Sequence, residues 1–294
     1  MAALNYAEAY QAELAQAYPY VLHFAALRST PNDTRFKWVD AQTVKIPTLT
    51  TTGRVPGDRD TIAAAKRNFN NAWTALTLKN FRSWSTLVHP MDIDETNQVA
   101  SIGNITRTFN ETQKFPEMDC YLSSKLFADW ETAGGSKDTT VVTTDNVLSI
   151  LDGWLENAME HNVPLNGLML YLTPHINTIL KSAKGMVRQF ANGDARLRRT
   201  VEALDELTIE PVPSGLMKTT YNFTEGWKPG TSPKQINMFM AHPTAVITPE
   251  KYTFASLDAP CAKTGGKYLY YEEAYDDTFL LPARKDALMY SVEA

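Results

Sequence analysis

Apolar residues at helical spacing organise the middle of the chain, between positions 89 and 130. Four of them recur at steps of three or four residues and predict one apolar stripe: Val99, Ile102, Ile105 and Phe109. Pro116 removes an amide donor and clashes with the preceding turn, so the helix is expected to kink or restart near Phe115. We therefore predict one long kinked helix, or two helices in tandem, on which the other elements pack.

Both ends of this helical region carry residues typical of helix boundaries. Asp92 is predicted to be the N-cap, because Glu95 follows three residues later, where a capping-box carboxylate can reach back. Gly134 and Gly135 are expected to end the helix after Trp130.

The N-terminal third predicts an arm followed by an extended hairpin. Residues 3–18 form a predicted short helix with few large aliphatic side chains, so this arm must lie on another element. Residues 36–49 alternate apolar and polar positions, with Val44 and Ile46 on one side of a strand, and extended structure returns at 73–88. The connecting segment is rich in turns and charges, which predicts a long functional loop between two paired strands.

The charged side chains of this loop have both signs and too few apolar neighbours to form a core. Mixed charge of this kind favours contact with a neighbouring subunit. The residues expected to make that contact are Arg54, Asp58, Arg59, Asp60, Lys66 and Arg67.

The second half of the chain predicts a compact α/β unit followed by more β structure. Asp145 is expected to cap one helix, and Thr173 with Pro174 to begin another, with the buried strand GLMLYLT between them. Short strands are predicted between 198 and 212 and in the segments QINMFMA and AVI. KYLYYEEAYDDTFLL and ALMYSV predict strands near the C-terminus, so the fold class is α+β.

Composition excludes several classes of protein. The chain has 294 residues, 44% of them hydrophobic, and a net charge of −5, which argues against a dedicated nucleic-acid binder. Two cysteines fit a reducing compartment and predict neither a disulfide framework nor a zinc cluster. No basic leader precedes an apolar run and no stretch of about 18 apolar residues occurs, so we expect a cytoplasmic protein with no signal peptide and no membrane contact.

Signatures of catalysis are absent from the sequence. There is no nucleophile elbow, no phosphate-binding loop and no glycine-rich dinucleotide fingerprint. One alternative stays open, because His89 precedes three carboxylates that together could hold a metal: Asp92, Asp94 and Glu95. Their position at a helix start explains the carboxylates equally well, so we predict no catalytic, cofactor-binding or metal-binding residue.

A basic patch lies in the second half of the chain. It comprises Lys181, Lys184, Arg188, Arg196, Arg198 and Arg199. Such a patch can contact phosphate nonspecifically, or it can be a solvated face or meet an acidic partner subunit.

Several segments, taken in order, resemble one protein family. WSTLVHPMDIDETN, FNETQKFPEMDCYLSSKL, VPSGLMKT, INMFMAHPTAVITP and KYLYYEEAYDDTFLL resemble segments of major capsid proteins of tailed bacteriophages, in particular phages of low-GC Gram-positive bacteria. The resemblance covers nearly the whole chain and implies the Hong Kong-type capsid fold. It implies four regions: an N-terminal arm at 1–35, an extended loop at 36–86, a peripheral domain with a spine helix at 87–140 and 248–294, and an axial domain at 141–247.

The resemblance also implies a function without catalytic residues. Such a subunit assembles with itself into pentamers and hexamers of an icosahedral shell around double-stranded DNA, in the host bacterial cytoplasm and finally in the virion. Portal and scaffolding proteins are implied partners. Many family members begin with a long scaffolding segment, whereas the arm here is short, which implies a separate scaffolding protein or the removal of a pro-segment. Arg196, Arg198 and Arg199 of the axial domain are expected to contact neighbouring subunits. A bacterial compartment shell of the encapsulin kind is an alternative with the same fold.

Overall fold

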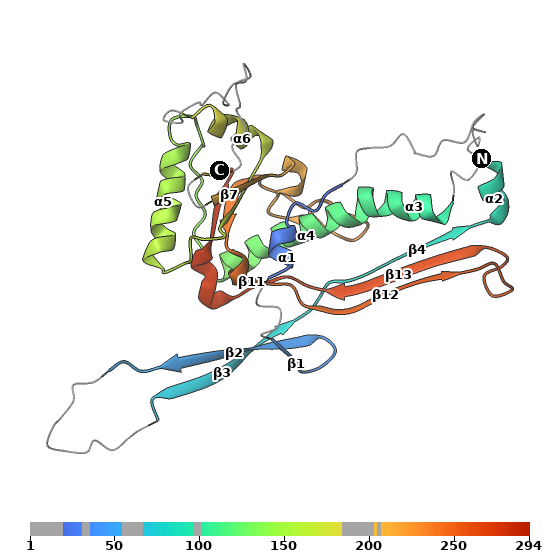
Figure 1. The fold of residues 1–294 in the computed structure, drawn as a ribbon, viewed down its shortest axis with the longest axis horizontal. Helices are drawn as coiled ribbons and strands as arrows, with labels where there is room; N and C mark the ends of the chain where they lie inside the picture. The colour runs from blue at the N-terminus through green and yellow to red at the C-terminus, as the bar shows by residue number, and fades with distance from the viewer. Residues whose placement is uncertain (1–19, 31–35, 55–66, 97–100, 184–202, 205–206) are drawn as a thin grey trace, which may run out of the picture.

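The computed structural model describes residues 20–30, 36–54, 67–96, 101–183, 203–204 and 207–294 (Figure 1). The fold is α+β, as predicted, with a long helical rod, a five-stranded sheet, a three-stranded sheet and a projecting hairpin. The predicted arm helix at 3–18 lies outside the described residues.

The five-stranded sheet has the strand order β15-β10-β5-β7-β6. Its strands are β5 (Met169–Leu172), β6 (Ala203–Leu204), β7 (Leu207–Pro211), β10 (Ile236–Ala241) and β15 (Leu288–Val292). Only β5 and β7 run parallel. The central strands are apolar at successive positions because both faces of the sheet are covered.

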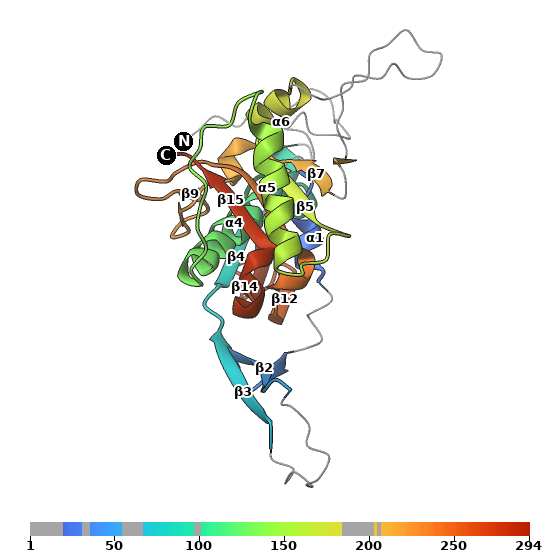
Figure 2. The same cartoon turned by 90° about the vertical axis from the view of Figure 1, so that its left-hand side faces the viewer.

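One face of this sheet packs on helices α5 (Val147–Glu160) and α6 (Pro174–Lys181), as Figure 2 shows for α5. The opposite face packs on the C-terminal half of the rod, with the rings of Tyr171, Phe239 and Tyr290 stacked across three neighbouring strands. Alternate residues of β5 and β10 therefore belong to different cores.

The rod begins with a short helix, α2 (Pro90–Glu95), and continues as α3 (Ile102–Phe109), the π-helix η1 (Asn110–Lys114) and α4 (Phe115–Thr132). The restart predicted near Phe115 is confirmed, since the π-helical turn ends at Lys114, α4 begins at Phe115, and Pro116 lies in the first turn of α4. The rod also ends where predicted, at Gly134, whose φ of 85° suits glycine.

The predicted N-cap Asp92 is wrong. His89 caps α2, because its Nδ1 accepts the amide of Met91, and Asp92 lies in the first turn. The stripe of α3 is only half-buried at Ile102, Ile105 and Phe109, whereas α4 carries the fully buried residues of the rod. Val99 lies outside the described residues.

The three-stranded antiparallel sheet lies along the rod (Figure 1) and has the order β12-β13-β4. Its strands are β12 (Glu250–Asp258), β13 (Tyr268–Asp276) and β4 (Phe81–Val88). Trp84 stacks on Phe109, and the ion pairs Arg82–Glu117 and Lys114–Glu272 join the same face of the sheet to the rod.

The projecting hairpin consists of β2 (Thr43–Thr51) and β3 (Phe69–Thr77), with the short β1 (Lys37–Trp38) at its base. Three of the smaller elements lie between β7 and β10 of the five-stranded sheet: η2 (Ser214–Leu216), β8 (Tyr221–Asn222) and β9 (Lys228–Pro229). The others connect the five-stranded sheet to the three-stranded sheet: η3 (Pro243–Ala245), β11 (Val246–Ile247), β14 (Phe279–Leu280) and η4 (Pro282–Ala287). Residues 20–28, which include α1 (Ala25–Arg28), insert Phe24 and Leu27 into the main core.

Strand pairing corrects two further predictions, and the start of α5 corrects a third. The extended segment predicted at 73–88 is two strands, and the second, β4, pairs with β13 instead of continuing the hairpin expected at 36–86. The last strand, expected with 248–294 beside the rod, pairs with β10 in the five-stranded sheet. Asn146, not Asp145, precedes α5, and its side chain accepts the amide of Thr143.

Candidate subunit interface

The hairpin carries an apolar stripe that the described part of the chain leaves uncovered. Pairing places Pro47 opposite Trp73, and Thr51 opposite Phe69. Because side chains alternate between faces, Pro47, Leu49, Phe69 and Trp73 all lie on one face. Leu49, Phe69 and Trp73 are 67%, 53% and 49% exposed, and a contiguous apolar surface of this kind marks an interaction site.

The opposite face of the hairpin changes character along its length. At the base, Val44, Ile46 and Leu76 pack on a small core with Leu78 and Phe279. Toward the tip the same face is polar, with Thr48, Thr50 and Asn70 exposed. Only the base is therefore part of the subunit's own core.

Charge distinguishes the hairpin from the rest of this acidic chain. In the described parts of the hairpin, residues 43–54 and 67–77, Lys45, Arg54 and Arg67 are the charged residues, and none is acidic. Arg67 donates from Nε to the carbonyl of Phe69, 3.2 Å away, and its guanidinium lies over the Phe69 ring. The described hairpin is thus basic and aromatic.

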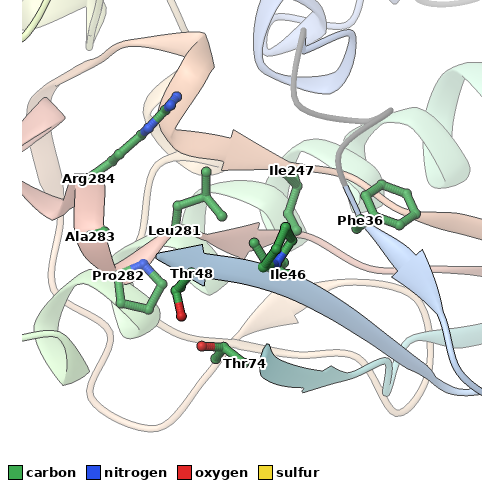
Figure 3. Close-up of a pocket in the computed structure, with 10 residues that line it drawn as sticks. Phe36, Ile46, Thr48, Thr74, Ile247, Leu281, Pro282, Ala283 and Arg284 are labelled. Carbon is green, nitrogen blue, oxygen red and sulfur yellow. The ribbon is translucent and has the colours of Figure 1, made fainter. Parts of the chain in front are cut away.

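The root of the hairpin is hydrogen-bonded to the end of β13 and to Asp277, and it borders a cavity. Lys79 donates its amide to the buried carboxylate of Asp277 at 2.8 Å, and Tyr275 donates its hydroxyl to the carbonyl of Leu78. Beside this root lies a mostly apolar cavity of about 390 Å³ between Ile46, Ile247 and Leu281 (Figure 3). Arg284 at its rim donates to the carbonyl of Thr244.

A second exposed apolar surface is the face of the three-stranded sheet that points away from the rod. It comprises Phe81 and Leu87 of β4 and Tyr252 and Phe254 of β12, with Tyr271, Glu273 and Tyr275 of β13 between them. Rings are in contact along this face, as for Phe81 with Tyr275 and Tyr252 with Phe254. Figure 1 shows that the hairpin extends away from this sheet, so the two surfaces do not cover each other within one chain.

No protein-family model matches the chain, and no curated protein matches its sequence. Solved structures match it over nearly its whole length. A structure of the mature capsid of bacteriophage PhiM1 has a TM-score of 0.67 at 11% identity, covering 98% of this chain and 91% of that chain. The capsid structure of cyanophage P-SCSP1u has a TM-score of 0.66 at 12% identity, and the match covers 98% of this chain and 93% of that chain. A structure from Mycobacterium phage Che8 has a TM-score of 0.65 at 16% identity, and the match covers 97% of this chain and 96% of that chain.

The chain has the Hong Kong-type phage capsid fold. The predicted fold is confirmed, and neither alternative, the compartment shell or the metal enzyme, is favoured by these comparisons. The resemblance to phages of low-GC Gram-positive bacteria stays a prediction.

Within this capsid fold, most of the predicted contact residues fall outside the described residues. Arg54 and Arg67 are described, and both are exposed at the distal end of the paired strands. The other loop residues, Asp58, Arg59, Asp60 and Lys66, lie outside the described ranges, as do Arg196, Arg198 and Arg199. For all nine residues, contact with a neighbouring subunit remains a prediction.

The apolar stripe was missed by the sequence reasoning. Its signal was present, because Pro47 and Leu49 are two residues apart in β2 and Phe69 and Trp73 are four apart in β3. Only the strand register shows that the two pairs share a face.

The metal alternative finds no geometric support in the described part of the chain. No group of three or more His, Cys, Asp and Glu side chains there could hold an ion. His89 uses Nδ1 to accept the Met91 amide, which is a capping role. The helices of the described ranges also include none that is long and apolar enough to cross a bilayer.

Proposed function

We propose that this chain is a major capsid protein, a non-enzymatic subunit that assembles with itself into pentamers and hexamers of an icosahedral phage head. The observation that carries the proposal is the capsid fold over nearly the whole chain, combined with a hairpin whose described strands are basic and carry an apolar stripe that the described part of the chain leaves uncovered. A stripe of exposed Leu49, Phe69 and Trp73 is unfavourable in a free monomer and becomes favourable when a neighbouring copy buries it.

The stripe fits the outer face of the three-stranded sheet of a neighbouring subunit. Both surfaces are apolar and rich in rings, and ring pairs add to the free energy of burying apolar area. The charges are complementary too, since Lys45, Arg54 and Arg67 of the hairpin would approach Glu273 of the sheet. Repetition of one such heterologous contact around an axis closes a ring.

The remaining parts of the proposal rest on the fold and on the predicted roles. The assembled shell encloses double-stranded DNA, which it contacts nonspecifically, and its place is the virion after assembly in the bacterial cytoplasm. Portal and scaffolding proteins are further proposed partners. Arg54, Asp58, Arg59, Asp60, Lys66 and Arg67 act at the hairpin contact, and Arg196, Arg198 and Arg199 act where axial domains meet.

Removal of the stripe tests the function. The double variant Leu49→Ser/Trp73→Ser is compared with Ala72→Ser, which changes the polar face at the same distance from the hairpin base. Negative-stain microscopy and sedimentation of the purified chain should show shells, tubes or capsomer rings for the wild type and for Ala72→Ser. The double variant should remain a folded, unassembled subunit with an unchanged melting temperature.

The two possible failures are distinct. Intact shells from the double variant would overturn the hairpin contact and leave the capsid function standing. A wild-type chain that remains monomeric at every protein and salt concentration would overturn the capsid function itself.

A further inference from the structure

Residues 20–28 are attached to the rod through a buried carboxylate. Phe24 and Leu27 of this segment are fully buried against α4 and the five-stranded sheet. On the α4 surface that faces this segment lies Asp119, which has no solvent exposure. Ionisation of a carboxyl group at such a site has a large free-energy cost unless both oxygens are hydrogen-bonded.

Only one oxygen of Asp119 is satisfied. Oδ2 accepts the hydroxyl of Tyr20 at 2.6 Å and the backbone amide of His23 at 3.0 Å, so both bonds come from the docked segment. Oδ1 is buried and has no hydrogen-bond partner in the structure. A protonated carboxyl group has no net charge to desolvate, and its O–H adds a donor at this position.

The positive charge beside Asp119 also comes from the segment. Arg28 donates from Nη2 to the carbonyl of Met118 at 2.6 Å, while its buried Nε has no hydrogen-bond partner. The carbonyl of Arg28 accepts the hydroxyl of Thr248. The Arg28 guanidinium is therefore bonded to the rod through a neutral carbonyl, that of Met118, and only partly neutralises Asp119.

The surroundings contain more carboxyl groups than cations. The titratable and charged groups that face this junction are Tyr20, His23 and Arg28 of the segment, Glu117 and Cys120 of α4, Arg82 of β4, which pairs with Glu117, Tyr171 of β5, Glu210 of β7 and Asp276 of β13. Nδ1 of His23 lies 3.4 Å from Oε1 of Glu210, and the imidazole carries a charge only when it is protonated. Added protons therefore reduce the net negative charge of the whole junction.

We propose that protonation of Asp119 controls the docking of residues 20–28, so that the segment binds the rod more tightly on acidification and loosens as the pH rises. The segment is a proton-dependent latch between the N-terminal region and the rod. The inference rests on the internal geometry of the subunit and holds whether or not the shell function is correct.

The direction of the pH dependence follows from linkage. Burial raises the pKa of Asp119, and this effect outweighs the lowering by Tyr20, His23 and Arg28. Burial likewise raises the pKa of Glu117 and of Asp276. An acid with a higher pKa when docked binds its proton more tightly in the docked state. Its contribution to docking is complete below the ordinary carboxyl pKa of about 4 and is lost as the pH rises through the docked value.

Hydrogen exchange of the full-length chain between pH 5 and pH 8, corrected for the intrinsic exchange rate, measures the latch directly. Between the ordinary carboxyl pKa and the docked pKa, the opening equilibrium of residues 20–28 should increase by up to about tenfold per pH unit for one proton, and it should level off above the docked pKa. The amides of α4 report global opening and should not follow this increase. Asp119→Asn should remove most of the pH dependence, because the amide keeps the shape and an acceptor oxygen but does not titrate.

Two further variants make the test decisive. Asp152→Asn, on the exposed side of α5, is the matched control and should behave as the wild type. Tyr20→Phe removes a bond that lowers the pKa of Asp119, so it should move the pH dependence to higher pH even if Asp119→Asn does not fold. Exchange profiles of Asp119→Asn or Tyr20→Phe that superimpose on the wild type, or opening that increases on acidification, would overturn the proposal.

Discussion

The indole ring of Trp84 lies flat on the ring of Phe109, with ring centroids 3.8 Å apart and planes inclined by 7°. This stack joins the edge strand β4 to the rod where α3 gives way to the π-helical turn. Two ion pairs on the same face of the sheet, Arg82–Glu117 and Lys114–Glu272, follow it along the rod. The sheet and the rod are therefore fixed to each other by a row of side chains, which leads to the first prediction.

Trp84→Ala should lower the free energy of unfolding by about 2–3 kcal/mol, because it removes a half-buried stacked ring. Trp73→Ala, which truncates an exposed indole of the hairpin, should change the stability of the unassembled chain by no more than about 0.5 kcal/mol. Urea denaturation of both variants gives the comparison. Equal losses from the two variants would show that the stack does not hold the sheet.

Gly135→Ala should destabilise the chain by about 2 kcal/mol or more, because an added Cβ would lie 2.2 Å from the Trp130 ring. Gly153→Ala is the matched change in the interior of α5, where nothing lies within 4 Å of the added carbon. It should stabilise the chain by about 1 kcal/mol through helix propensity. Melting temperatures that move in opposite directions would confirm both, and a stable Gly135→Ala chain would show that Trp130 can move aside.

The two thiols should react at very different rates in the native chain. Burial raises the pKa of Cys120 to about 12, whereas hydrogen bonds from Thr264 lower the pKa of the exposed Cys261. A lower pKa gives more thiolate at neutral pH, so a disulfide reagent should label Cys261 first. Thr264→Val should slow that labelling several-fold, and labelling of both thiols at equal rates would contradict the buried position of Cys120.

Charge reversal at Arg196, Arg198 and Arg199 should change assembly more than folding. Exposed charges each contribute only about 0–1 kcal/mol, but the same contact repeats in every subunit of a ring. The melting temperature of the variant should stay close to that of the wild type, while its assembly should shift along a salt series, because salt screens such contacts. Light scattering that gives superimposable curves at every salt concentration would identify the patch as a solvated face.

The sequence by itself determined the elements whose cause is local. Pro116 determined where the rod restarts, and Gly134 determined where it ends. Thr173 and Pro174 determined where α6 begins. In each case the cause is local, because the backbone donors and the allowed dihedral angles depend on the residue itself. The uninterrupted apolar run of β5 indicated a buried strand, because a strand that is covered on both faces has no side chains facing solvent. The joint order of such segments also sufficed to predict the capsid fold.

Tertiary structure decided which elements pair and which side chains meet. Strand β4 adjoins the hairpin in sequence but pairs with β13, and β15 pairs with β10, because pairing depends on contacts between residues far apart in the chain. The apolar stripe exists only through the register of β2 with β3. Asp119 is a candidate protonation site only in the folded chain, where residues 20–28 pack on it, since burial and not residue type raises the pKa of that carboxyl group.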